Sequence, residues 1–132
     1  MSTARKAGLA VVFLWFALGG LGHFVLTGLE METLPEWVPW PRETVLASGV
    51  LELLGAAGLA LERTRRLAGW GLFALTVAVT PANVHMLQRA ELFPSVPVWA
   101  LVVRLPVQVL LLALILWSTA PVRARAPDGA RR

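Results

Sequence analysis

Five polar side chains inside otherwise apolar stretches could do chemistry: an imidazole, a carboxyl, a guanidinium and two amides. The carboxyl, Glu52, lies near the middle of the apolar segment 44–61, where a charge costs about 2.5–3.5 kcal/mol unless another group compensates it. Such groups can bind a polar molecule, exchange a proton or pair with one another. The candidate ligand-pocket residues are His23, Glu52, Asn83, Arg104 and Gln108.

Small residues around Glu52 indicate that it faces other helices rather than lipid. Ser48, Gly49, Gly55 and Ala56 lie three or four positions away from it, on the same face of a helix. Small side chains let membrane helices approach closely. Glu52 is therefore predicted to point into a helical bundle.

The composition is that of an integral membrane protein rather than a soluble domain. Of 132 residues, 57% are hydrophobic and 15% are charged, and the mean hydropathy is +0.68. Cysteine is absent, which excludes disulfides, thiol catalysis and cysteine-based metal sites. The net charge of +4 does not indicate nucleic-acid binding, because the basic residues flank the hydrophobic segments.

The chain is predicted to be all-α, an integral membrane four-helix bundle formed by residues 1–120. Each apolar segment is long enough to cross the hydrocarbon core of a bilayer. The spans are predicted at about 7–29, 44–61, 67–87 and 98–120. The first is longer than the hydrophobic region of a signal peptide, so we predict that it is retained. Residues 121–132 are predicted to form a disordered basic tail.

Four residues are predicted to shape the bundle rather than bind a ligand. Pro81 and Pro106 each remove a backbone hydrogen bond, in the third and the fourth span. Trp37 and Trp40 lie in the proline-rich loop 30–43 and suit the headgroup layer of a membrane. This loop is predicted to be a short ordered cap across one mouth of the bundle.

The distribution of basic residues predicts that both termini are cytoplasmic. Nine lysines and arginines lie on the side of the termini and of the turn 62–66, against Arg42 and Arg89 on the other side. Positive charge concentrates in the cytoplasmic loops of membrane proteins. The cap is therefore predicted to face outward.

Helical rise places the candidate side chains at similar depths, about 6–15 Å from the outer ends of their spans. Glu52 and Arg104 are expected to form an ion pair across facing helices. The cluster could serve only to hold the helices together, or it could also bind a ligand. A metal site is not predicted, because His23 and His85 belong to different spans and Arg104 would repel a cation.

Motifs in the cap and in all four predicted spans resemble those of the DoxX-like family of small bacterial membrane proteins. They are GxxHF at 20–24, PxWxP at 35–39, SGxxELLGAxGL at 48–59, PAN at 81–83 and RLPxQ at 104–108. The resemblance implies a four-helix protein of the bacterial cell (inner) membrane. It also implies an association with sulfur or thiol oxidation, quinone-coupled complexes or redox-stress assemblies, and a redox enzyme as partner, but no known reaction.

The leading hypothesis is an accessory membrane subunit, not catalytic on its own, whose pocket holds a quinone- or lipid-like ligand or docks a redox partner. The first alternative is a proton-linked small-molecule transporter, in which Glu52 alternates between its charged and neutral forms. Inverted repeats would favour transport, and the sequence shows no clear one. The second alternative is a ligand-free structural or chaperone-like membrane protein. The lipid bilayer is a partner in each case.

Overall fold

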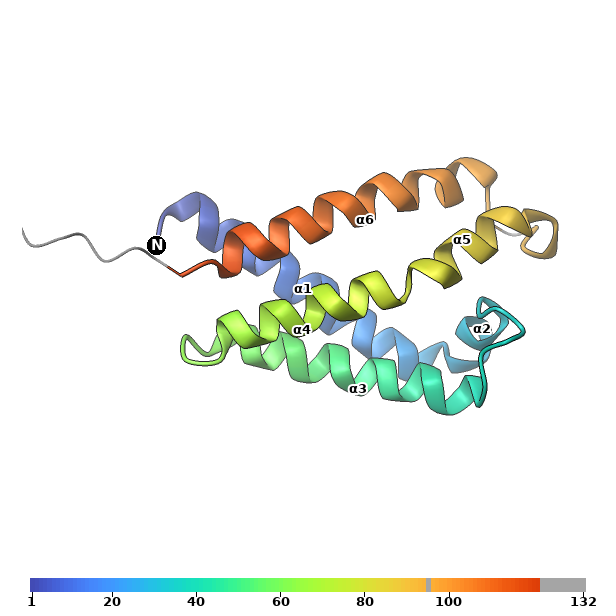
Figure 1. Cartoon of the computed structure of the whole chain (residues 1–132), viewed down its shortest axis with the longest axis horizontal. Coiled ribbons are helices and arrows are strands. Elements are labelled where there is room, and N and C mark those ends of the chain that lie inside the picture. The colour runs from blue at the N-terminus through green and yellow to red at the C-terminus, as the bar shows by residue number, and fades with distance from the viewer. Residues whose placement is uncertain (95, 122–132) are drawn as a thin grey trace, which may run out of the picture.

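The computed structural model describes residues 1–94 and 96–121, and its regular elements there are all helices. In chain order they are α1 (Thr3–Val25), α2 (Thr27–Glu32), α3 (Pro41–Ala60), α4 (Arg65–Ala78), α5 (Thr80–Gln88), the 3-10 helix η1 (Ala90–Leu92) and α6 (Val98–Thr119) (Figure 1). Within the described residues, four helices are long and apolar enough to cross a membrane, with α4 and α5 taken together as Arg65–Gln88. The prediction of an all-α fold with four long apolar helices is confirmed for these residues. Residues 122–132 of the predicted tail lie outside the described residues.

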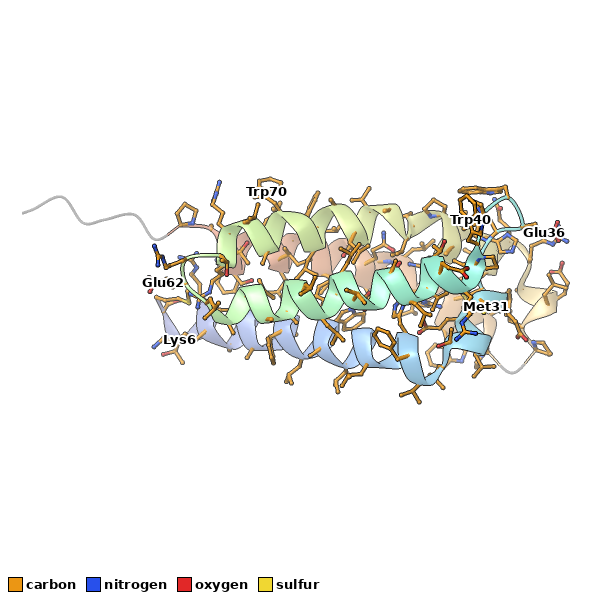
Figure 2. All side chains as sticks on the ribbon, turned by 90° about the horizontal axis from the view of Figure 1, so that it is seen from below. Lys6, Met31, Glu36, Trp40, Glu62 and Trp70 are labelled. Atoms are coloured by element: carbon orange, nitrogen blue, oxygen red, sulfur yellow. The ribbon has the colours of Figure 1, made fainter. Side chains whose placement is uncertain are left out.

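The long helices run between two ends of the bundle that differ in composition. One end holds the N-terminus, the α3–α4 turn and the last turn of α6, and the other holds α2 and the loop 33–40 (Figure 1). Figure 2 shows Lys6 and Glu62 at the first end, and Glu36 and Trp40 at the second. We call these the basic end and the cap end.

The first helix ends four residues earlier than the predicted span, because it breaks at Leu26. The Leu26 N–H donates to the Gly22 carbonyl at 2.7 Å, and Thr27 Oγ1 donates to the His23 carbonyl at 2.7 Å. These bonds satisfy carbonyls that the end of a helix would otherwise leave open. Glu30, predicted to begin the cap loop, lies instead in the short helix α2.

The two prolines inside predicted spans have different effects. α4 ends at Ala78 and α5 begins at Thr80, so the third span is interrupted just before Pro81, which has no amide hydrogen. α6 runs on through Pro106, so that proline does not end its helix.

The buried core lies toward the basic end. α3 ends and α1 begins at the basic end. Leu59 is the second-last residue of α3, and Val12 lies in the first half of α1. Close packing of such side chains leaves little room for water. We call this cluster the apolar plug, and its residues are Val12, Phe16, Ala56, Leu59, Leu72, Leu111 and Ile115.

Glycines let α1 and α3 approach closely. A Cβ atom built on Gly49 would lie 2.7 Å from His23 Cβ and 3.0 Å from Phe24 Cε2. One built on Gly20 would lie 2.8 Å from Leu53 Cγ. Carbon atoms do not approach so closely without displacement, so both positions require glycine, which has no side chain.

Gly49→Ala should lower the free energy of unfolding by about 1–3 kcal/mol, because the added methyl group would push α1 away from α3. Gly71→Ala is the matched control, since no atom lies within 4 Å of a Cβ built there. Alanine also has the higher helix propensity, so this control should not lose stability. Unfolding in detergent measures both variants, and equal losses would contradict a close approach specific to Gly49.

Candidate functional site

A cavity of about 470 Å³ lies between the apolar plug and the cap end. Its lining includes Phe16 and Leu111 of the plug, and Thr33 and Leu34 at the start of the cap loop. Cavities of about 300–1,000 Å³ are typical of small-molecule sites. All five sequence-predicted pocket residues line it: His23 from α1, Glu52 from α3, Asn83 from α5, and Arg104 and Gln108 from α6.

Glu52 faces His23. The His23 Nε2 atom lies 3.5 Å from Glu52 Oε2, and His23 Nδ1 lies 2.8 Å from the Val45 carbonyl oxygen. A carbonyl can only accept, so Nδ1 carries the proton that it donates. Gly19 makes room for the carboxyl, since a Cβ atom there would lie 3.1 Å from Glu52 Oε2. The close approach of α1 to α3 therefore makes His23 the neighbour of the Glu52 carboxyl.

The prediction of an ion pair between Glu52 and Arg104 is wrong. Among residues 1–94 and 96–121, no carboxylate oxygen lies within 4.0 Å of the Arg104 guanidinium. Arg104 Nη1 instead donates to Met86 Sδ at 3.2 Å, and a thioether is a weak acceptor. Arg104 lines the cavity and is also exposed at the bundle surface. Most of its N–H donors are thus available to a ligand or to solvent.

Glu30 is a cavity residue that the sequence analysis missed. Its Oε2 atom lies 3.2 Å from His23 Nδ1, because the break at Leu26 lets α2 turn over the end of α1. A threonine followed by a glycine, Thr27 and Gly28, was the available signal that the first helix would end before Glu30. Without that break, Glu30 would extend beyond the span.

Burial raises the pKa of the Glu30 carboxyl above its ordinary value of 4.5. Burial acts in this direction because it disfavours the charged form. The neighbouring His23 lowers this pKa, Glu52 raises it and Arg104 lowers it, in decreasing order of effect. Since burial has the largest effect, Glu30 takes up a proton more readily than an exposed glutamate.

Two carboxylate oxygens in the cavity have no directed hydrogen bond. Glu30 Oε2 and Glu52 Oε2 are buried atoms without a hydrogen-bond partner in the part of the chain that the structure describes. Both lie close to the imidazole of His23, but its Nδ1–H points at the Val45 carbonyl, and 3.5 Å from Nε2 is long for an N–H···O bond. A buried acceptor without a donor is costly. A ligand hydroxyl, an ammonium or a water molecule would satisfy either oxygen.

The two amides are engaged with each other. Asn83 Nδ2 donates to Gln108 Oε1 at 2.6 Å, and Gln108 Nε2 donates to Thr80 Oγ1. Thr80 Oγ1 in turn donates to the Thr76 carbonyl at 3.4 Å. This chain of bonds ties α5 to α6 on one wall of the cavity, and Thr80 is a member that the sequence analysis missed. Asn83 and Gln108 therefore have a structural role whether or not a ligand binds.

A double-mutant cycle on Asn83→Ala and Gln108→Ala should give a coupling energy of about 0.6–1.7 kcal/mol, as for other hydrogen bonds between membrane helices. The same cycle on Gln88→Ala and Gln108→Ala is the control, because the hydrogen bonds of Gln108 go to Asn83 and Thr80 rather than to Gln88, and the two effects should add. Unfolding in detergent measures both cycles. A coupling energy near zero for the first pair would show that the bond does not stabilise the bundle.

A second, open groove of about 520 Å³ runs beside α5. Pro35 and Trp37 of the cap line one side of it, and Pro81, His85 and Gln88 of α5 line the other. Trp37 thus shares this groove with α5, and most of its surface is exposed. The groove is separate from the residues that pair with Glu52.

Trp40 marks the start of α3. It has a left-handed backbone, with φ of 47°, and directly precedes Pro41, the first residue of that helix. Thr44 Oγ1 donates to the Pro39 carbonyl at 3.1 Å and closes this turn. The exposed indole of Trp40 suits a membrane–water interface.

Comparison with known proteins gives one match. A family model with the description "Domain of unknown function (DUF8561)" matches residues 9–120. No curated protein matches the chain, and no solved structure does. Nothing in these comparisons bears on the resemblance to the DoxX-like family, which stays a prediction. Because the matched residues include every residue of the cavity and most of the chain, the protein belongs to the DUF8561 family.

Proposed function

We propose that this protein binds a quinol- or quinone-like ligand in the cavity and presents it to a redox enzyme, without catalysing a reaction on its own. One observation carries the proposal. Buried carboxylate oxygens on one side of the cavity have no directed donor, while the Arg104 guanidinium on α6 has a thioether as its protein acceptor. The cavity therefore favours a ligand with hydrogen-bond donors at one end and an acceptor at the other.

A hydroquinone has both kinds of group at opposite ends of one ring. A hydroxyl can donate to Glu52 or Glu30, and the other oxygen can accept from Arg104. The ring would lie against the apolar side chains Phe16 and Leu111, which form part of the cavity wall. A mostly apolar site with a few convergent polar groups is typical of small-molecule binding.

An apolar ligand tail would leave the cavity between α1 and α6. Trp15 of α1 and Arg104 of α6 both line the cavity and are exposed on the bundle surface. The two helices meet near the basic end, where a Cβ atom on Gly8 would lie 2.9 Å from Trp117 Cζ3. Figure 1 shows α1 crossing away from α6 toward α3 at the cap end.

The setting that we propose is the inner membrane of a bacterial cell, with the cap end outward and both termini in the cytoplasm. Four apolar helices of sufficient length among the described residues support insertion, and the nine-to-two distribution of basic residues supports this orientation. The chain has no cysteine, so electrons from a bound quinol would pass to a separate protein. The resemblance to the DoxX-like family supports such a partner.

Decyl hydroquinone, kept reduced, should raise the melting temperature of the purified protein. At about 100 times its dissociation constant, a ligand adds roughly 2.7 kcal/mol to the stability. Arg104→Met should abolish this shift, because it removes the donors that face the ligand oxygen. Gln88→Ala in the second groove is the control and should keep the shift.

Mass spectrometry of small molecules retained after gentle purification is the companion measurement. A quinone recovered from the wild type and not from Arg104→Met would support the same site. If decyl hydroquinone leaves the wild-type melt unchanged and no quinone copurifies, the cavity does not serve this ligand. The polar cluster would then have a structural role.

A further inference from the structure

Three acid–base groups follow one another from the cap end into the cavity. Glu30, on α2, is the outermost, and 30% of its side chain is exposed. His23 comes next, with Nδ1 3.2 Å from Glu30 Oε2, and its Nε2 lies 3.5 Å from Glu52 Oε2. The Glu52 side chain is only 13% exposed. Each contact joins a carboxylate oxygen to a ring nitrogen that can carry a proton.

The charged or titratable groups among the described cavity residues come from four helices. They are His23 of α1, Glu30 of α2, Glu52 of α3 and Arg104 of α6. The polar side chains that α4 and α5 contribute, Thr76 and Asn83, do not titrate.

The path stops at the apolar plug. Phe16 and Leu111 separate the cavity from deeper plug residues such as Leu72 and Ile115, which are 1% and 0% exposed. The plug contains no ionisable side chain among the described residues. Packed apolar side chains offer a proton neither a carrier nor ordered water.

We infer that Glu30, His23 and Glu52 form a proton half-pathway, which joins Glu52 to the aqueous phase at the cap end and is closed toward the basic end. The half-pathway uses the cavity of the proposed function and would carry off, one after the other, the two protons that a bound quinol loses when the partner enzyme takes its two electrons. It needs no ligand in order to operate. Glu52 can therefore be tested for proton access in the empty protein.

The proton transfer balances along the three groups. Protonated Glu52 gives its proton to the bare Nε2 of His23, which becomes an imidazolium. The Nδ1–H then turns from the Val45 carbonyl to the Glu30 carboxylate, whose Oε2 lies 3.2 Å away, and Glu30 takes up the proton and releases it to water. One proton leaves Glu52 and one reaches the aqueous phase. The ring is left with its proton on Nε2, and proton exchange with water restores the starting tautomer.

Labelling by dicyclohexylcarbodiimide tests which side reaches Glu52, because this reagent enters the bilayer and modifies protonated carboxyls. Spheroplasts expose one end of the protein to the medium, and inside-out vesicles expose the other. The variant Glu36→Cys identifies the cap side in each preparation, because Glu36 lies at the cap end. The medium is on the cap side where an impermeant maleimide labels this cysteine. Mass spectrometry then measures modification at Glu52 as the pH of the medium is varied while the interior stays buffered.

Modification of Glu52 should follow the pH on the cap side. It should increase when the medium on that side is acidified. Acidification on the basic-end side should leave it unchanged. Modification that follows the basic-end side, or both sides equally, would overturn the half-pathway. Such a result would not affect the predicted shift in melting temperature with decyl hydroquinone, which tests the proposed function separately.

Variants that place polar side chains in the apolar plug give a second test. The measurement is proton flux into proteoliposomes under a potassium diffusion potential. The wild type should match protein-free vesicles, because the pathway ends at Glu52. Leu111→Asn with Ile115→Asn extends the polar surface one turn toward the basic end and should create a leak. Adding Glu52→Gln should return the flux to baseline. A leak that persists without the Glu52 carboxyl would contradict the proposed route.

Discussion

His23→Leu should lower the free energy of unfolding by about 3–5 kcal/mol, because it leaves two buried carboxyls without their shared partner. The imidazole nitrogens lie 3.2 Å from Glu30 Oε2 and 3.5 Å from Glu52 Oε2, and neither oxygen has a directed hydrogen bond from another described residue. The loss should be largest when both carboxyls are ionised. Unfolding in detergent at neutral pH measures it.

A neutral background separates charge from packing. Adding Glu30→Gln and Glu52→Gln to His23→Leu should recover most of the stability, because no unpaired charge then remains. His85→Leu in the second groove is the control and should have a small effect, since no carboxylate of the described chain pairs with it. If His23→Leu melts like His85→Leu, the carboxyls do not depend on the imidazole.

Acid should partly rescue His23→Leu. Burial raises the pKa of Glu30 in the folded protein, so the folded state binds more protons than the unfolded state in the range between the two pKa values. Stability of the variant should therefore increase as the pH falls from 7 toward the ordinary value of 4.5. Stability that falls over this range would contradict a destabilising pair of carboxylates.

Depth along a helix could be predicted from the sequence. The rise per residue is nearly constant, so the distance of a side chain from the end of its span follows from counting. His23, Glu52, Asn83, Arg104 and Gln108 were placed in the same half of the bundle in this way, and in the structure they line one cavity. An error of two or three residues in a helix end changes such a depth by only a few ångströms.

The partner of each group could not be predicted by the same reasoning. Depth does not give the rotation of a helix about its axis or the distance between two helices. Glycines at positions 19, 20 and 49 bring α1 against α3, and this contact sets Glu52 beside His23 instead of Arg104. Two groups at equal depth on helices that do not face each other stay unpaired.

The helix break at Leu26 had a second consequence that counting could not give. A continuous span to residue 29 would carry Glu30 out toward the headgroups, whereas the short helix α2 places it over His23. The break depends on local backbone bonds from Leu26 and Thr27, which compete with an apolar pattern that favours a longer helix. Tertiary contacts between α2 and α3 then hold the short helix in place.

A cysteine introduced by Glu36→Cys should react with an impermeant maleimide in intact cells, whereas one introduced by Glu62→Cys should react only after the cells are permeabilised. Both side chains are exposed, and Figure 2 shows them at opposite ends of the bundle. The natural chain has no cysteine, so each variant carries a single reporter.

The difference between these two variants should be all or none, because a hydrocarbon core about 30 Å thick separates the ends and the reagent cannot cross it. The nine-to-two distribution of basic residues predicted from the sequence sets the expected direction. The opposite labelling pattern would place the mouth of the cavity in the cytoplasm. A proton released through Glu30 would then enter the cytoplasm, and oxidation of a bound quinol would not contribute to a proton gradient across the membrane.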